Sequence, residues 1–213
     1  MHTEWIKKVL ILKTKGVMAV VSGPSGVGKG TVCSYLTEKY DDFFLSISAT
    51  SRAPRPNEQE GVHYYYKTQE EFDAMIENDE LLEYARYVGK SYGTPKAPCM
   101  EHIENGENVI LEIEVQGGMK VKEKEPETIM IFVVPPSMEE LEARLRGRGT
   151  EAEEVIIQRL ERAKTELLLM KDYDYIVVNN SVEETAEQIR SIMVSEGLKT
   201  KNILNNIKEE LEL

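Results

Sequence analysis

The sequence has 213 residues, of which 26 are Lys or Arg and 38 are Asp or Glu, so its formal net charge is −12. Hydrophobic residues make up 41% and charged residues 30%, an ordinary globular composition that excludes a wholly disordered or fibrous chain. The length suits one domain with small subdomains. A pI near 4.9 argues against nucleic-acid binding, because a phosphate backbone attracts a basic surface. Any phosphate that this chain binds must therefore be held by a local cluster of basic groups.

The cysteines and the apolar runs indicate the compartment. Cys33 and Cys99 show no CxxC spacing, so neither a disulfide framework nor a zinc site is predicted, and we expect a reducing, cytoplasmic compartment. No run approaches the roughly 20 apolar residues of a membrane helix, so we expect no membrane partner. Residues 1–16 hold one apolar run, 9–12, shorter than a signal-peptide core. We expect a helical or frayed extension there.

In chain order, short apolar runs rich in β-branched residues alternate with amphipathic segments. The first run is followed by a glycine-rich turn and a predicted helix over 29–40. Strands are predicted at 17–22, 109–114, 129–134 and 175–179. Near-continuous apolar strands are typical of parallel sheets covered on both faces. The alternation therefore predicts an α/β fold, a parallel sheet flanked by helices.

Capping boxes mark the predicted starts of four helices. In each, Ser or Thr stands three residues before Glu, ahead of an apolar-periodic run. The pairs are Thr68/Glu71, Ser137/Glu140, Thr150/Glu153 and Ser181/Glu184.

Two segments depart from the alternating pattern. Residues 50–94 contain two prolines, an aromatic-rich strand at 63–67, one helix and a glycine-rich exit, and we expect a small inserted subdomain there. Residues 144–162 gather arginines beside two glycines in an otherwise acidic chain, which suits a hinged lid. The remaining chain divides into a core of 17–49, 95–143 and 163–195 and a charged helical tail of 196–213.

A glycine-rich loop joins the first predicted strand to its helix. Glycines let backbone amides turn toward an anion, and the helix N-terminus adds the positive end of its dipole. Lys29 can then reach the β- and γ-phosphates of a nucleoside triphosphate. This is the Walker A pattern with one departure, because Gly30 stands where Ser or Thr usually helps to hold Mg²⁺, and Thr31 is the candidate substitute. The predicted ATP-binding residues are Gly23, Pro24, Ser25, Gly26, Val27, Gly28, Lys29, Gly30 and Thr31.

A glycine turn that merely connects strand to helix is the alternative. The order of strand, loop, lysine and helix favours the nucleotide site. It also favours a P-loop NTPase type of sheet.

A second group of residues suits the acceptor of a phosphoryl group. In the stretch TSRAPRPNEQEGVHYYY, residues 50–66, Arg52 and Arg55 offer two planar forks for a phosphate, and Tyr64 offers a hydroxyl. Further on, Glu83 supplies a carboxylate, and the turn at 91–94 supplies more hydroxyls.

On these residues the sequence resembles the guanylate kinase family, from about residue 17 to about residue 192. The TSRxxR stretch matches the family's segment at its Arg, acidic, Gly and Tyr positions. The resemblance implies a GMP site whose phosphate contacts are Arg52, Arg55, Tyr64 and Tyr92. It implies guanine contacts on Ser48, Glu83 and Thr94. Guanine presents N1–H and N2–H₂ donors that one carboxylate accepts together, whereas adenine presents an acceptor at N1.

The stretch ILEIEVQG, residues 110–117, resembles the strand in which many guanylate kinases carry Asp. Alternate residues of a strand point to opposite sides, so we expect Glu112 and Glu114 on one face, beside the loop. We expect one or both to bind Mg²⁺ through water and to contact the purine. Glu112 with Thr31 is the candidate metal set, and Glu114 is a candidate GMP contact. A solvated strand face is the alternative.

The stretch LRGRGTE, residues 145–151, resembles the family's lid. The resemblance implies that Arg148 and Arg159 reach across the phosphates, and it puts Asn179 near the adenine. Solvated helix charge is the alternative for the arginines.

The implied function is that of a nucleoside monophosphate kinase: ATP and GMP give ADP and GDP, Mg²⁺ accompanies ATP, and dGMP is a second acceptor. The GMP phosphate is already ionised, so no side-chain base is needed. Catalysis is then positioning and charge neutralisation by Lys29, Arg55, Arg148 and Arg159.

Two alternatives remain, another nucleoside monophosphate kinase and a binding protein of a different class. The loop GPSGVGKGT also resembles that of cytidylate kinases, but the TSRxxR segment and Glu83 fit guanine. A guanylate-kinase-like scaffold binds phosphoprotein ligands without catalysis and typically lacks the P-loop lysine or the lid arginines. The presence of Lys29, Arg148 and Arg159 favours the enzyme. The sequence carries no signal for an oligomeric state.

Overall fold

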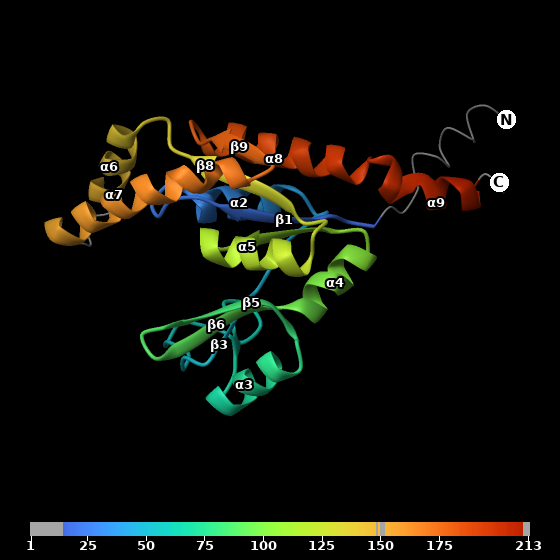
Figure 1. Cartoon of the computed structure of the whole chain (residues 1–213), viewed down its shortest axis with the longest axis horizontal. Coiled ribbons are helices and arrows are strands. Elements are labelled where there is room, and N and C mark those ends of the chain that lie inside the picture. Colours follow the sequence, from blue (N-terminus) through green and yellow to red (C-terminus); the bar gives the residue numbers. More distant parts are fainter. Residues whose placement is uncertain (1–14, 148, 150–151, 211–213) are drawn as a thin grey trace.

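A five-stranded sheet forms the centre of the molecule (Figure 1), and every neighbouring pair of its strands is parallel. The computed structural model describes residues 15–147, 149 and 152–210. In spatial order the strands are β2 (Phe43–Leu45), β7 (Asn108–Glu112), β1 (Met18–Ser22), β8 (Ile129–Val134) and β9 (Tyr175–Val178). The predicted α/β class with a parallel sheet is confirmed.

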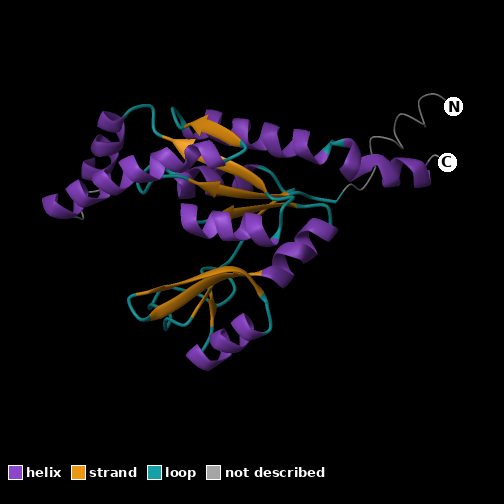
Figure 2. Cartoon of the chain, in the orientation of Figure 1, coloured by secondary structure: helices purple, strands orange, loops and turns teal. Residues whose placement is uncertain are grey.

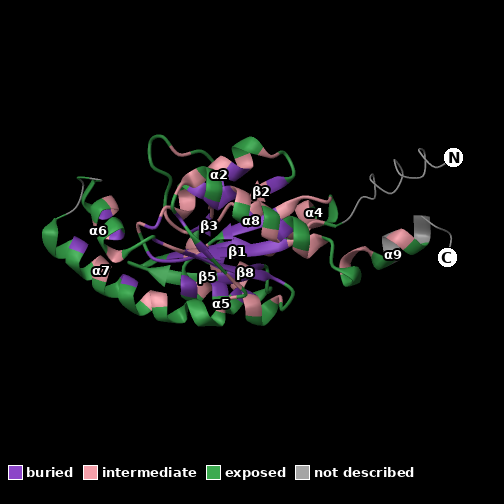
Figure 3. Cartoon of the chain, turned by 90° about the horizontal axis from the view of Figure 1, so that it is seen from above, coloured by how far each residue is buried: buried purple, intermediate pink, exposed green. Residues whose placement is uncertain are grey.

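Helices cover both faces of this sheet (Figure 2). One face packs against α2 (Lys29–Lys39) and α8 (Val182–Gly197), and the other against α4 (Lys96–Glu104) and α5 (Val115–Lys124). Alternate residues of β1 point to opposite faces of the sheet. Val21 packs in the apolar cluster with α2 and α8, and Val20 packs in the apolar cluster with α4 and α5. Both are fully buried, and Figure 3 shows the central strands β1 and β8 in purple, the colour of buried residues.

A second, smaller sheet lies on the α4 and α5 side of the core (Figure 1). Its spatial order is β4 (Tyr65–Tyr66), β3 (Ala49–Thr50), β6 (Lys90–Pro95) and β5 (Leu81–Tyr87). Helix α3 (Gln69–Glu77) packs on it through Phe72, which is buried against Ala49 and Leu81. The predicted strand at 63–67 is too long, since His63 still belongs to a turn in which its amide donates to the Gln59 carbonyl.

The remaining helices extend beyond the sheets. They are α6 (Met138–Gly147), α7 (Glu153–Leu167), the short 3₁₀ segment η1 (Leu168–Asp172) and α9 (Thr200–Glu210). In Figure 1, α6 and α7 project from one end of the core. Within the described ranges, no helix is long and apolar enough to cross a membrane.

Three of the four predicted helix starts carry the expected cap. Thr68 and Glu71 form a complete capping box, and the Ser137 and Ser181 hydroxyls accept from the third backbone N–H that follows. The fourth is wrong, because α7 begins at Glu153 itself with Ala152 as its N-cap. Thr150 lies outside the described residues.

Candidate functional site

The glycine-rich loop leads from the end of β1 into the first turn of α2, as predicted for residues 23–31. Gly23 and Gly28 have φ of +147° and +100°, conformations that side chains rarely adopt. A Cβ on Gly23 would lie 2.2 Å from the Val133 carbonyl oxygen, and one on Gly28 would lie 2.6 Å from the Asn179 amide nitrogen. The loop therefore needs glycine for both its turn and its packing.

Lys29 lies at the start of α2 and folds back over the loop. Its Nζ donates to the carbonyl oxygens of Gly23 at 2.7 Å and Pro24 at 3.2 Å. Burial lowers the pKa of Lys29, and the nearby Glu112 carboxylate acts in the opposite direction. The ammonium group is thus held at the loop by weak carbonyl acceptors, which an anion bound there could replace.

A cleft of about 620 Å³ opens in front of this loop. The parts of the chain that line it include the loop with Ser25 and Lys29, helix α7 with Arg159, and the β5–β6 hairpin with Tyr87. Nη1 of Arg159 donates to the Ser25 hydroxyl at 3.3 Å, so this predicted arginine does reach the loop. Arg148, the other predicted lid arginine, lies outside the described residues.

Glu112 and Glu114, at and just after the end of β7, also line the cleft. They do not lie on one face of a strand. Strand β7 ends at Glu112, and Glu114 is the N-cap residue of α5, so the predicted strand at 109–114 is two residues too long. Glu114 is exposed and accepts from Nη2 of Arg162 at 2.9 Å. The expectation of a shared strand face is therefore wrong, because the strand ends at Glu112 and Glu114 already caps the next helix.

Glu112 lies beside the first turn of α2. A Cβ on Gly30 would lie 3.4 Å from Oε2 of Glu112, and the predicted substitute Thr31 is exposed in the same helical turn. Partial desolvation raises the pKa of Glu112, and Lys29 opposes this shift. A carboxylate and a hydroxyl are hard oxygen donors, so this pair fits Mg²⁺ that reaches the loop on a nucleotide.

A second polar site lies on the small sheet, where Glu83 of β5 faces Thr94 of β6. The Thr94 hydroxyl donates to Oε1 of Glu83 at 2.9 Å. Glu83 is only 9% exposed, and desolvation raises its pKa. Its other oxygen faces α5, since a Cβ on Gly117 would lie 3.2 Å from Oε2. A buried carboxylate with one hydroxyl donor has room for further donors from a ligand.

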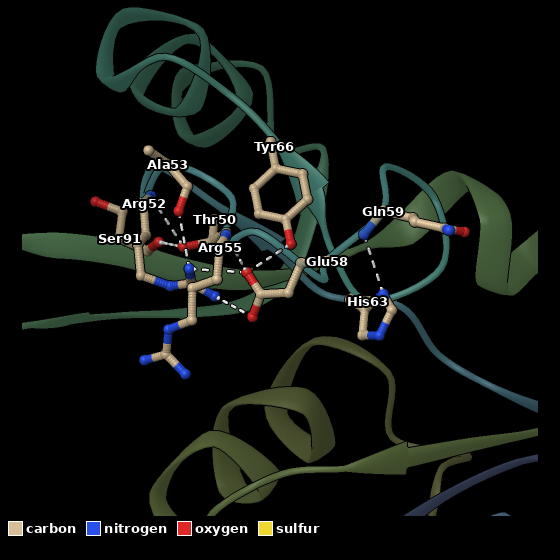
Figure 4. Close-up of polar contacts among 9 residues, drawn as sticks. All are labelled: Thr50, Arg52, Ala53, Arg55, Glu58, Gln59, His63, Tyr66 and Ser91. Atoms are coloured by element: carbon tan, nitrogen blue, oxygen red, sulfur yellow. Dashed lines mark hydrogen bonds and ion pairs between the residues drawn. The ribbon is translucent and has the colours of Figure 1, made fainter.

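Three of the predicted phosphate contacts, Arg52, Tyr64 and Tyr92, lie together on the same sheet. The Arg52 guanidinium lies 5.4 Å from the centre of the Tyr64 ring, and Tyr64 meets Tyr92 edge-to-face with ring centres 6.1 Å apart. Arg55 is exposed, and Figure 4 shows its guanidinium pointing away from the contacts around Arg52. Ser48 lies just before β3, where its carbonyl accepts from the Tyr65 amide at 2.9 Å.

Sequence reasoning missed two supporting residues. Glu58 pairs with both terminal nitrogens of Arg52 at 2.9 Å (Figure 4); its acidic position in the TSRxxR segment was a signal, but only as part of a motif. Arg144 donates to the carbonyl oxygens of Val27 at 3.2 Å and Asn179 at 3.0 Å, behind the loop. Its place among many arginines gave no such signal.

Comparisons with known proteins agree with one another. A family model described as guanylate kinase matches residues 15–196. A guanylate kinase of Halalkalibacterium halodurans is 49% identical over 94% of this chain and 98% of its own length, and one of Oceanobacillus iheyensis is 48% identical over 95% and 98%. The crystal structure of guanylate kinase from Anaplasma phagocytophilum aligns with 92% of this chain and 95% of its own, at a TM-score of 0.71 and 36% identity.

Proposed function

The chain belongs to the guanylate kinase family, and on that premise we propose that it transfers the γ-phosphoryl group of ATP to GMP, giving ADP and GDP. One observation carries the proposal. A single cleft is lined by Lys29 of the loop, by Arg159 of α7 and by Tyr87, which belongs to the same strand as the buried Glu83. A triphosphate on the loop and an acceptor on the small sheet would therefore share one space.

We propose that the loop residues 23–31 hold the ATP phosphates. The amides at the start of α2 face an anion with the positive end of the helix dipole, and Lys29 exchanges its carbonyl partners for phosphate oxygens. Arg159 neutralises charge on the transferred group, together with Arg148. Mg²⁺, held beside Glu112 and Thr31, supplies further charge neutralisation when it is bound with ATP.

The acceptor site proposed for GMP runs from Glu83 to Arg55. The raised pKa of Glu83 supports base reading, because guanine N1–H and N2–H₂ would supply the donors that this buried carboxylate lacks. Ser48 and Thr94 complete the base site, Arg52, Arg55, Tyr64 and Tyr92 hold the phosphate, and Glu114 borders the purine. The contacts fall on base and phosphate, so dGMP serves as a second acceptor.

We propose that closure completes the site. The insert, residues 50–94, and the lid, about 144–162, close over the core of 17–49, 95–143 and 163–195, and they exclude water that would otherwise accept the phosphoryl group. The GMP phosphate attacks as an ionised nucleophile, so no side chain has to remove a proton. The buried free thiols of Cys33 and Cys99 suit a reducing cytoplasm, where this reaction would run.

A coupled assay tests this function. ADP formation is measured with ATP against GMP, dGMP, AMP and CMP at equal concentrations. We expect turnover with GMP and dGMP and at least about 10²-fold lower kcat/KM with AMP and CMP, since the wrong base leaves Glu83 facing an acceptor. Equal turnover of CMP and GMP would contradict the proposal.

A further inference from the structure

The carboxylate of Glu58 is surrounded by hydrogen-bond donors (Figure 4). Its Oε1 accepts from Nη2 of Arg52 at 2.9 Å. Its Oε2 accepts from Nη1 of Arg52 at 2.9 Å, from the Arg55 backbone N–H at 2.8 Å and from the Tyr66 hydroxyl at 3.0 Å. One side chain thus joins the segment after β3, the turn that carries Arg55, and strand β4.

This arrangement keeps Glu58 charged. Its side chain is 15% exposed and that of Arg52 is 18% exposed, so water screens the pair only in part. The Arg52 guanidinium, helped by the Arg55 N–H, lowers the pKa of Glu58 to about 2. Glu58 is therefore an acceptor at any pH at which the enzyme works.

The contacts of Glu58 divide the Arg52 guanidinium into an edge that Glu58 holds and a second edge that Glu58 leaves open, and Arg52 also interacts with the Tyr92 hydroxyl. Glu58 takes one N–H from each terminal nitrogen, and the Ala53 carbonyl accepts from Nη1 at 2.8 Å. The Nε–H and the second N–H of Nη2 form the remaining edge, which is a complete bidentate fork. Because the guanidinium is planar and rigid, fixing one edge fixes the direction of the other.

We infer that Glu58 is a positioning residue, which aims the second edge of Arg52 and the turn of Arg55 at the acceptor phosphate. The inference rests on the proposed function. The competing explanation is that Glu58 occupies the place of the phosphate itself. The geometry favours positioning. Apart from Arg52, Glu58 contacts the Tyr66 hydroxyl and the Arg55 backbone N–H, whereas the other proposed phosphate partners are Tyr64, Tyr92 and the Arg55 guanidinium.

The substitution Glu58→Gln tests this role at constant size. All four contacts of Glu58 come from donors, so a glutamine nitrogen must face at least one of them and turn Arg52 or the Arg55 loop away. GMP binding is measured by calorimetry without ATP, and KM and kcat by the coupled assay. We expect the Kd and KM for GMP to rise about tenfold or more, with the KM for ATP unchanged within about twofold.

Three further variants separate positioning from general damage. Glu60→Gln makes the same change in the same loop. Glu60 accepts a hydrogen bond from the Tyr66 backbone N–H, and the amide oxygen of glutamine can accept the same bond, so GMP binding should be unchanged. Arg52→Ala weakens GMP binding on its own, and Glu58→Gln added to it should cost less than about twofold more. Tyr66→Phe removes one donor to Glu58 without a change of charge. This variant should fold, so it still tests the inference if Glu58→Gln fails to fold.

The outcomes are distinct. Unchanged or tighter GMP binding by Glu58→Gln overturns the inference and supports the competing explanation, and so does a loss of equal size in the Arg52→Ala background. For Tyr66→Phe, a small rise in the Kd for GMP supports positioning and a fall overturns it. If the unaltered protein binds no GMP in the calorimeter, the proposed function itself fails and this inference fails with it.

Discussion

The side-chain amide of Asn179 donates to the Val27 carbonyl oxygen at 2.7 Å, which ties the end of β9 to the phosphate loop from behind. Asn179 is 3% exposed, and its Oδ1 lies 3.0 Å from the Thr185 hydroxyl, which also contacts the Ser181 carbonyl oxygen at 2.6 Å. Arg144 donates to the carbonyl oxygens of the same two residues. The buried contact therefore supports the shape of the loop.

Asn179→Asp should destabilise the protein and weaken ATP binding. The substitution replaces the only donor of this side chain with an oxygen, which would face the Val27 carbonyl in a buried position. We expect a loss of about 2 kcal/mol in the free energy of unfolding, measured in urea, and a higher KM for ATP. Asn180→Asp, at the exposed neighbour, is the matched control. Equal effects of the two substitutions would show that Asn179 does not brace the loop.

Lys29→Met should nearly abolish turnover and leave the fold intact. Methionine has a similar length and lacks the charge that neutralises the transferred phosphoryl group. We expect kcat to fall by at least about 10²-fold, with little change in the melting temperature, because the two hydrogen bonds that Lys29 makes within the described part of the chain both go to loop carbonyls. Normal turnover by a folded Lys29→Met protein would refute phosphoryl transfer at this loop.

Arg55→Ala should weaken GMP binding far more than ATP binding. Its guanidinium is exposed beside the proposed acceptor phosphate, so the substitution removes a charged fork and disturbs little packing. We expect the KM for GMP to rise about 10- to 100-fold with the KM for ATP unchanged. Arg86→Ala, which removes an exposed arginine paired with Asp73 on the same small sheet, serves as the control. A loss that fell on ATP would mean that the insert is not the acceptor site.

Strand and loop could be predicted where the pattern is local. The apolar run of β1, the glycine loop and the Thr68 capping box each depend on residues within a few positions of one another. The ends of strands could not be predicted in this way. The sequence pattern up to Glu114 is the same whether the strand continues or a helix begins after it. Asn179 and Val27 are 152 residues apart in the sequence, and the residues around neither of them indicate the contact.

Within the site, residue types were predictable and their partners were not. Arg52 was recognisable as a phosphate fork, but its pairing with Glu58 depends on how an irregular loop folds back over six residues. Glu114 is expected near the purine, but its contact with Arg162 from α7 had no signal in the sequence. In both cases the ion pair depends on how an irregular segment folds, and no periodic pattern in the sequence gives its path.

Val88 stands in a strained position at the tip of the β5–β6 hairpin. It has φ of +47° and is 82% exposed, and it joins Gly89, with φ of +70°, in a two-residue turn between Tyr87 and Lys90. Left-handed backbone costs a β-branched residue about 1–2 kcal/mol, whereas Asn-Gly suits this turn. Val88→Asn should therefore raise the free energy of unfolding by about 1 kcal/mol. Gly89→Ala should lower the free energy of unfolding, because alanine would have to adopt the positive φ of Gly89. If both substitutions raised the free energy of unfolding, the backbone at Val88 would not be strained.

Glu83→Gln tests base recognition most directly. The substitution keeps the size of the side chain and one acceptor oxygen but converts the other oxygen into a donor, which would face an N–H of guanine in a buried site. We expect kcat/KM for GMP to fall by about 10²-fold or more, while AMP loses less and the apparent affinity for ATP changes little. Glu80→Gln, three residues away on the exposed approach to β5, is the control and should leave both acceptors unaffected. If GMP and AMP fell equally, Glu83 would support the small sheet through Thr94 instead of reading the base, and discrimination would pass to Ser48 and Glu114.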